Sequence, residues 1–228
     1  MLKKAVVLGS YLSLLLGNPA LAQAPYFKSG ILGGGDAQRP GIIKNGLPSA
    51  GFTSGNTSQA AGLIGVIGGY RFIFNQGATF GMDVSSNYLS GNDMKKAMAQ
   101  LGLPFNNQLK RDFNVVPSFS FGKMIDNHLH IALGLGLGIA QVKHRVVNVD
   151  PSAPVPPSQT TLGFVPSFGA EYAWTKNISF IGNVSYEMYR KVNAAFSPKT
   201  DPALPGSSYW SAIKPKFLAP KAGIIYRF

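Results

Sequence analysis

The sequence predicts an all-β fold, an eight-stranded antiparallel transmembrane β-barrel with short turns at one end and four long loops at the other. Segments of about ten residues alternate between apolar side chains and small or polar ones, as in membrane barrels. After the first 22 residues, no apolar run is long enough for a spanning helix. The 228 residues include no Cys and only 13% are charged, while 11% are aromatic, which excludes a disulfide scaffold, a Cys-based zinc site and a disordered chain.

The first 22 residues have the composition of a cleaved export signal. Lys3 and Lys4 precede an apolar run from Ala5 to Leu16, and Ala20-Leu21-Ala22 forms an A-x-A cleavage site. The mature barrel domain is therefore expected to span residues 23–228, and the loss of two lysines takes its formal charge from +12 to +10. An uncleaved anchor is the alternative, but the apolar run is shorter than the ~20 residues that a spanning helix needs.

The alternation is clearest between Leu129 and Ala140, where odd positions are Leu or Ile and even positions are His, Ala or Gly. In a strand these sets lie on opposite faces, one suited to lipid and one to a packed interior. A soluble β-sandwich also alternates, but its outward face should carry Lys, Glu and Thr, whereas the polar face here is Gly, Ser and Asn. The same pattern recurs at residues 78–88, 112–122, 161–174 and 178–188.

Three short turns and four long loops alternate along the chain, so they join eight strands. The turns are expected at residues 75–77, 126–127 and 175–177, and the loops at about 36–61, 89–111, 148–159 and 193–208. The first, second and eighth strands are then expected at about 25–35, 62–74 and 210–228, with both termini on the periplasmic side. In the second loop, the apolar spacing from Met94 to Leu101 predicts a short helix.

Aromatic residues are expected near both membrane interfaces. The periplasmic set is Tyr70, Phe72, Phe74, Tyr172, Trp174, Tyr226 and Phe228, and the outer set is Tyr88, Tyr189, Tyr209 and Trp210. The last strand places Ile224, Tyr226 and Phe228 on one face, and a terminal aromatic resembles the assembly signal of bacterial outer-membrane barrels. The predicted partners are outer-membrane lipid and, through Phe228, the barrel assembly machinery.

Several stretches resemble the surface-antigen family of eight-stranded outer-membrane barrels, which includes major surface proteins of rickettsia-like bacteria and is similar to opacity proteins and OmpA-type barrels. They are Tyr26–Gly30, Gly163-Phe164, Gly169–Tyr172, Asn177–Phe180 and Tyr186–Lys191. The resemblance implies an immunodominant protein of a Gram-negative bacterium, located in the outer membrane with loops exposed at the cell surface. Some members of the family have porin activity and others take part in host-cell contact. The family offers no catalytic motif.

The lumen is expected to hold five charged residues, namely Arg71, Asp83, Asp112, Glu171 and Glu187. Arg71 and Asp83 flank the turn at 75–77 almost symmetrically, so we expect them to face each other as a cross-strand pair. Two interpretations stay open at this point. The charges either form a salt-bridged plug or act as a gate in a narrow ion path.

The loops carry most of the positive charge. The basic candidates are Lys95, Lys96, Lys110, Arg111, Lys143, Arg145, Arg190, Lys191 and Lys199. They either attract phosphates of outer-leaflet lipid or bind a polyanionic host glycan or an acidic receptor on the host cell surface. Nucleic acid is disfavoured as a partner, because the basic residues are dispersed over the loops of an exported protein.

The predicted function is that of an outer-membrane surface antigen with small porin activity through a narrow lumen. The alternative is a non-conducting adhesin that binds host polyanionic glycans or receptors through its basic outer loops. No enzyme activity, catalytic residue, metal site or cofactor is predicted. His128 and His130 share a strand face but have no third ligand nearby, and His144 with Asp112 or Asp83 is the one pairing of a catalytic type.

Overall fold

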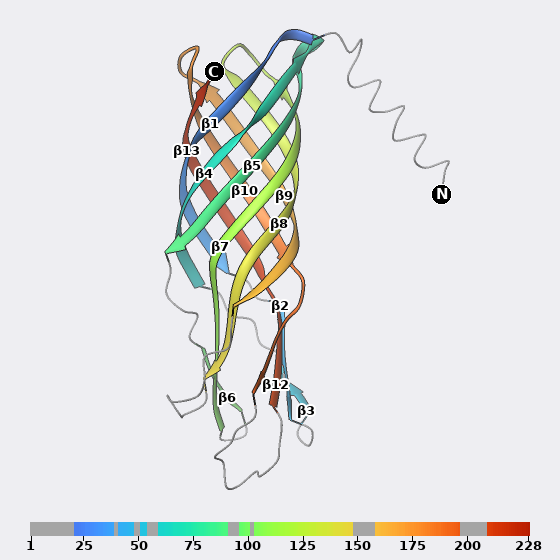
Figure 1. Cartoon of the computed structure of the whole chain (residues 1–228), viewed down its shortest axis with the longest axis vertical. Coiled ribbons are helices and arrows are strands. Elements are labelled where there is room, and N and C mark those ends of the chain that lie inside the picture. The colour runs from blue at the N-terminus through green and yellow to red at the C-terminus, as the bar shows by residue number, and fades with distance from the viewer. Residues whose placement is uncertain are drawn as a thin grey trace, which may run out of the picture.

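The computed structural model describes residues 21–38, 41–47, 51–53, 59–90, 96–100, 103–147, 158–196 and 209–228, and it confirms the predicted barrel (Figure 1). Its eight strands are β1 (Leu21–Gln38), β4 (Gln59–Phe74), β5 (Ala78–Ser90), β7 (Leu103–Met124), β8 (Leu129–Val147), β9 (Gln159–Ala173), β10 (Ile178–Tyr189) and β13 (Lys216–Arg227). Each pairs antiparallel with its neighbours in this order, and β1 pairs with β13 to close the cylinder. No helix in the described ranges is long and apolar enough to cross a membrane.

The three predicted turns are confirmed and lie at the barrel end where β13 finishes (Figure 1). Gln76 and Gly77 have positive φ angles of 65° and 76°, so the tight turn η1 (Asn75–Gly77) uses a glycine where one is needed. In the next turn the Asp126 carboxylate accepts hydrogen bonds from the backbone N–H groups of His128 and Leu129, both at 2.6 Å. These bonds favour the charged form and hold the pKa of Asp126 below its usual 3.8.

The outer face of the barrel is apolar over a band of defined height. On β7 the outward side chains from Phe113 to Phe121 are apolar, and on β8 the same holds from Leu133 to Ile139. Charged residues bound this band, because Lys123 is exposed towards the turn end and Lys110 lies at the loop end. A face of this composition, nine residues long on β7 and seven residues long on β8, fits the hydrocarbon core of a membrane.

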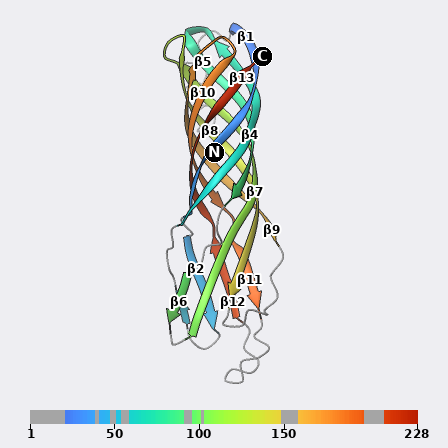
Figure 2. The ribbon, with the colours of Figure 1, turned by 90° about the vertical axis from the view of Figure 1, so that its left-hand side faces the viewer.

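The barrel strands continue beyond the band at the loop end, where Figures 1 and 2 show further strands. A short strand β6 (Lys96–Gln100) pairs with the start of β7, and a four-stranded sheet contains β11 (Val192–Phe196), β12 (Tyr209–Lys214), β2 (Gly41–Leu47) and β3 (Gly51–Thr53). Much of what the sequence predicted as loop is therefore β-structure.

Two expectations about these segments are wrong. The helix expected from Met94 to Leu101 is instead the strand β6, whose residues pair with residues 103–107 of β7. The eighth barrel strand starts at Lys216, since Pro215 separates it from β12, which belongs to the second sheet. Of the expected leader, Leu21 and Ala22 lie in β1, and residues 1–20 lie outside the described residues, so cleavage stays a prediction.

Candidate functional site

Two groups of charged side chains fill the lumen at different heights. We call the first the turn-side layer, which consists of Lys28, Arg71, Asp83, His130, Glu171 and Arg227. Glu171 is its centre, because Arg71 Nη1 donates to one carboxylate oxygen at 2.7 Å and Arg227 Nη2 donates to the other at 2.6 Å. Lys28 Nζ lies 2.9 Å from Asp83 Oδ1. All of these residues come from strands whose alternation turns them inward.

His130 is neutral in this layer, and its hydrogen bonds define which ring nitrogen carries the proton. Arg71 Nη1 lies 2.7 Å from His130 Nδ1, and an arginine can only donate, so Nδ1 must accept. The proton is then on Nε2, which donates to Thr79 Oγ1 at 2.7 Å. His130 therefore adds no charge to the layer.

The second group, the loop-side layer, is centred on Arg111 and consists of Asp36, Arg111, Asn114, Glu187, Tyr189 and Lys221. Arg111 Nη2 donates to Asp36 Oδ2 at 2.8 Å, and Arg111 Nη1 donates to Glu187 Oε2. Glu187 also accepts hydrogen bonds from Asn114 Nδ2 at 2.9 Å and from Tyr189 OH at 2.7 Å. The Arg111, Asp36 and Glu187 side chains are fully buried, so each charge depends on its partners.

An apolar cluster adjoins the loop-side layer. Its members are Leu109, Ala140, Val142, Tyr189, Val192, Ile213 and Phe217, all buried. Phe217 links the two features, because the Arg111 guanidinium lies 4.0 Å from the centre of its ring. The lumen is thus filled by charged and apolar side chains in turn, as expected for a barrel of eight strands.

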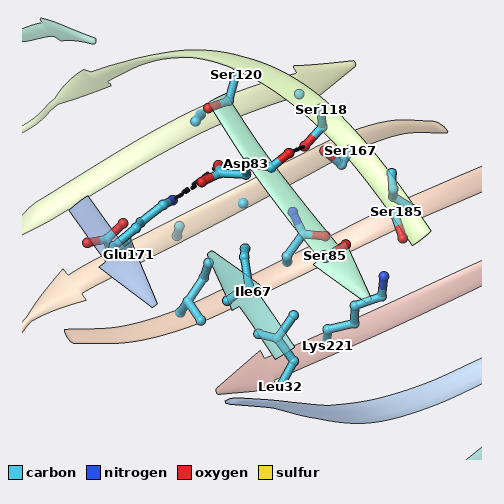
Figure 3. Close-up of a pocket in the computed structure, with 18 of the residues that line it drawn as sticks. Leu32, Ile67, Asp83, Ser85, Ser118, Ser120, Ser167, Glu171, Ser185 and Lys221 are labelled. Carbon is cyan, nitrogen blue, oxygen red and sulfur yellow. Dashed lines mark hydrogen bonds and ion pairs between the residues drawn. The ribbon is translucent and has the colours of Figure 1, made fainter. Parts of the chain in front are cut away.

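Between the two layers lies a cavity of about 80 Å³, which we call the chamber. Figure 3 shows side chains from opposite walls of the chamber, among them Ser120, Ser167 and Ser185. Its charged lining comes from Lys28, Arg71, Asp83 and Glu171 of the turn-side layer and from Lys221 of the loop-side layer. At roughly 10–15 Å³ per water, the chamber has room for several water molecules.

The barrel has a wider hollow at its turn end, the bowl, with a volume of about 460 Å³. Tyr26, Lys176, Arg227 and Phe228 contribute to its lining. Arg227 also bonds Glu171, so the turn-side layer forms the floor between the bowl and the chamber.

The structure places four of the five expected lumen charges inside the barrel, but it corrects their pairing. Arg71 and Asp83 do not face each other, since Arg71 lies opposite Gly81 and Asp83 opposite Gly69. They pair instead with Glu171 and Lys28, respectively.

Asp112 and Arg111 exchange their expected places because the β7–β8 pairing has a register shift between Arg111 and Phe113. Such a bulge moves the next side chain to the other face of the strand. Arg111, expected in a basic loop, points into the lumen. Asp112, expected in the lumen, bonds Lys143 at 2.8 Å and lies 3.5 Å from Lys110, and both lysine side chains are more than 40% exposed.

The remaining basic candidates are spread over the loop end. Lys96 lies in β6, Arg145 lies in β8, and Arg190 and Lys191 join β10 to β11 with exposed side chains. Lys95 and Lys199 lie outside the described residues. Among the aromatic residues, Tyr189 is not interfacial as expected, because it is buried in the lumen. The assembly-signal residues Ile224, Tyr226 and Phe228 all have outward, exposed side chains.

Sequence reasoning missed the roles of Lys28, Asp36, His130, Lys221 and Arg227. Their positions carried a signal, because each lies an even number of residues from another lumen-facing residue of its strand and so lies on the same face. Lys221 and Arg227, for example, alternate with the outward Ile224 and Tyr226. The histidines do not act together, since His128 lies in the exposed turn and His130 in the lumen. In the described part of the chain, no cluster of three or more His, Cys, Asp or Glu could hold a metal ion.

The sequence matches no protein-family model and no curated protein. The structure is similar to the outer membrane protein OprG from Pseudomonas aeruginosa, with a TM-score of 0.65 and 14% identity over 92% of this chain and 99% of that chain. Neisserial surface protein A matches with a TM-score of 0.47 and 15% identity, covering 90% of this chain and 100% of that chain. The Escherichia coli outer membrane protease OmpT matches with a TM-score of 0.37 and 10% identity, covering 92% and 98% of the two chains.

The likeness to OprG shows that the chain has the fold of an outer-membrane β-barrel, in agreement with its apolar outer face. OprG is described as an outer membrane protein and not as an enzyme. Absence of enzyme activity stays a prediction, as does membership of the rickettsial surface-antigen family.

Proposed function

We propose that this protein is a non-conducting barrel of the outer membrane that binds polyanionic ligands at its loop end, on the cell surface. The observation that carries the proposal is the filled lumen. The turn-side layer, the loop-side layer and the apolar cluster lie one after another along the barrel, and their central side chains are buried. This arrangement supports the adhesin interpretation over the small pore.

Charge at the loop end supports a polyanionic ligand. Two of the carboxylates nearest this end, Asp36 and Glu187, are buried in the lumen and bonded to Arg111. Asp112 is only partly exposed and is paired with lysines. By contrast, Arg190 and Lys214 are exposed. The described surface of the loop end is therefore positive, and it can attract sulfate, phosphate or carboxylate groups.

The strands at the loop end support a role in binding because exposed basic residues lie at their ends. β10 ends beside Arg190 and β12 ends at Lys214, so both residues are at the junction of the barrel with the second sheet. A resemblance to surface antigens also supports display of this end outside the cell. Two anionic ligands fit the same chemistry: phosphates of outer-leaflet lipid, and an acidic glycan of a host surface.

The experiment compares these ligands for the full barrel refolded in neutral phosphatidylcholine vesicles. We expect heparin, used as a soluble sulfated glycan, to bind with an affinity that falls as salt rises. The double variant Arg190→Glu/Lys214→Glu should bind about tenfold or more weakly, because each basic residue near an anionic surface contributes on the order of 1 kcal/mol. Binding is measured by the salt dependence of retention and by titration calorimetry.

The matched control reverses two exposed lysines at the turn end, Lys123→Glu/Lys176→Glu. It changes the net charge equally and should leave heparin binding unchanged. Equal losses in both variants would mean that only net charge matters, and this would overturn the proposal. Association with lipopolysaccharide vesicles without heparin binding would assign the charge to membrane lipid and would overturn the adhesin role.

A further inference from the structure

We propose that the chamber between the two layers holds a small monovalent anion of the halide type. The site is independent of the polyanionic ligand proposed for the loop end. It rests on the charge inside the lumen, on an arginine N–H left without a partner, and on the size and lining of the chamber.

The charged side chains of the lumen do not balance. The lumen-facing side chains that the structure describes include five cations, in residues Lys28, Arg71, Arg111, Lys221 and Arg227. They include four carboxylates, in residues Asp36, Asp83, Glu171 and Glu187. His130 is neutral through its hydrogen bonds. One positive charge is thus in excess, and a buried charge is costly unless something compensates it.

The excess positive charge belongs to the turn-side layer. The loop-side layer is balanced, with Arg111 and Lys221 against Asp36 and Glu187. In the turn-side layer, three cations meet two carboxylates. Glu171 is shared between Arg71, which lines the chamber, and Arg227, which lines the bowl, so the positive charge that lacks a carboxylate of its own is divided between these two spaces.

The chamber wall contains an unused hydrogen-bond donor. Arg71 is 96% buried, and its Nε–H has no hydrogen-bond partner among the described residues. Arg71 and Ser120 both line the chamber. Their polar atoms lie close together over Gly81, because a Cβ atom added to that glycine would touch both the Ser120 hydroxyl and Arg71 Nε. A serine hydroxyl can rotate to donate, so Arg71 and Ser120 together offer two neighbouring donors on the chamber wall.

The size of the chamber restricts the ligand. About 80 Å³ holds a halide together with a few waters, since a halide is only slightly larger than a water molecule. Serine hydroxyls at positions 85, 118, 120, 167 and 185 line the space. Ser118 donates to the backbone carbonyl of Asp83 and Ser185 donates to Glu187, so the neutral donors for an anion come from the serines at 85, 120 and 167. Entry is expected from the bowl, past Arg227, because the apolar cluster closes the other side.

The test uses the intact barrel, refolded at one pH and one ionic strength in chloride or in gluconate, an anion too bulky for the chamber. We expect chloride to stabilise the fold. Above the dissociation constant, the equilibrium constant for unfolding in urea should fall about tenfold for each tenfold rise in chloride. Crystals grown in bromide should show an anomalous peak in the chamber next to Arg71.

Two variants at one position sharpen the test. Ser120→Asp places a carboxylate beside Arg71 and supplies the missing negative charge, so it should abolish both the chloride effect and the bromide peak. Ser120→Asn has the same shape without the charge and should retain both. Identical stability of the unmodified protein in chloride and gluconate, or a chamber that holds only water in bromide crystals, would overturn the proposal even if Ser120→Asp failed to fold.

Discussion

Replacing Arg111 with Met should lower the free energy of unfolding of the barrel by about 3–5 kcal/mol, the range measured when one partner of a buried ion pair is removed. Arg111 is the one cation between Asp36 and Glu187 whose bonds reach both carboxylates, and all three side chains are fully buried. Met fills a similar volume but leaves two carboxylates in the loop-side layer with only Lys221 to compensate them, at 3.6 Å from Glu187.

Equilibrium unfolding in urea, followed by tryptophan fluorescence in detergent micelles, measures this loss. Lys110→Met is the matched control, since Lys110 is the neighbouring cation in β7 but has a side chain 41% exposed, and its loss should change stability by less than about 1 kcal/mol. The triple variant Arg111→Met/Asp36→Asn/Glu187→Gln removes the unpaired charges and should recover much of the stability. Equal effects of Arg111→Met and Lys110→Met would contradict the buried layer.

Replacing Phe217 with Ala should lower the free energy of unfolding by about 3–5 kcal/mol, as in the truncation of a large aromatic core residue. Phe217 is fully buried in the apolar cluster and supports the Arg111 guanidinium on its ring. The same truncation at Phe119, whose side chain is 55% exposed on the outer face, should cost much less because lipid or detergent replaces the ring.

The link between Phe217 and Arg111 is measured by a double-mutant cycle. Because the two side chains are in contact, Arg111→Met and Phe217→Ala should not be additive, and the coupling energy should exceed about 0.5 kcal/mol. The same urea assay provides all four stabilities. Strict additivity would mean that the loop-side layer and the apolar cluster are energetically separate, contrary to the structure.

The alternation of side chains made most of the barrel predictable. From Leu129 to Ala140, parity alone assigns the lipid-facing leucines and the lumenal glycines, and the structure agrees at these positions. The turn residues were equally informative, because Gly77 adopts a positive φ that glycine accepts without strain. These are local signals, so a single sequence is sufficient to detect them.

The charged layers were predictable only in part, because they depend on register and on contacts between distant strands. The bulge beside Asp112 has no clear local signature, yet it exchanges the faces of Arg111 and Asp112. Pairing is equally non-local, since Arg71 and Glu171 lie 100 positions apart in the chain. The alternation along β1 and β13 was sufficient to place Lys28 and Lys221 on the lumen face, but a lysine in a membrane strand is easily taken for an interfacial residue.

The strands at the loop end were missed for a different reason. Segments such as Gly41–Leu47 and Val192–Phe196 are short and contain Gly, Ala or Asn, which predict loops more readily than strands. The sheet that holds them also joins two connections, because β2 pairs with β12, whereas β11 pairs with β12 across its own connection. Strand continuation past the membrane therefore depends on tertiary pairing that local composition does not encode.

The closed lumen is tested most directly by single-channel recording of the mature protein in a planar lipid bilayer, after a heat-dependent shift in gel mobility has verified that the barrel is folded. A porin inserted by the same procedure serves as the positive control. The two layers and the apolar cluster predict no discrete conductance steps for the folded barrel. Reproducible steps, with an ion selectivity that changes in the folded variant Glu187→Gln, would show that ions pass the loop-side layer and would contradict the account.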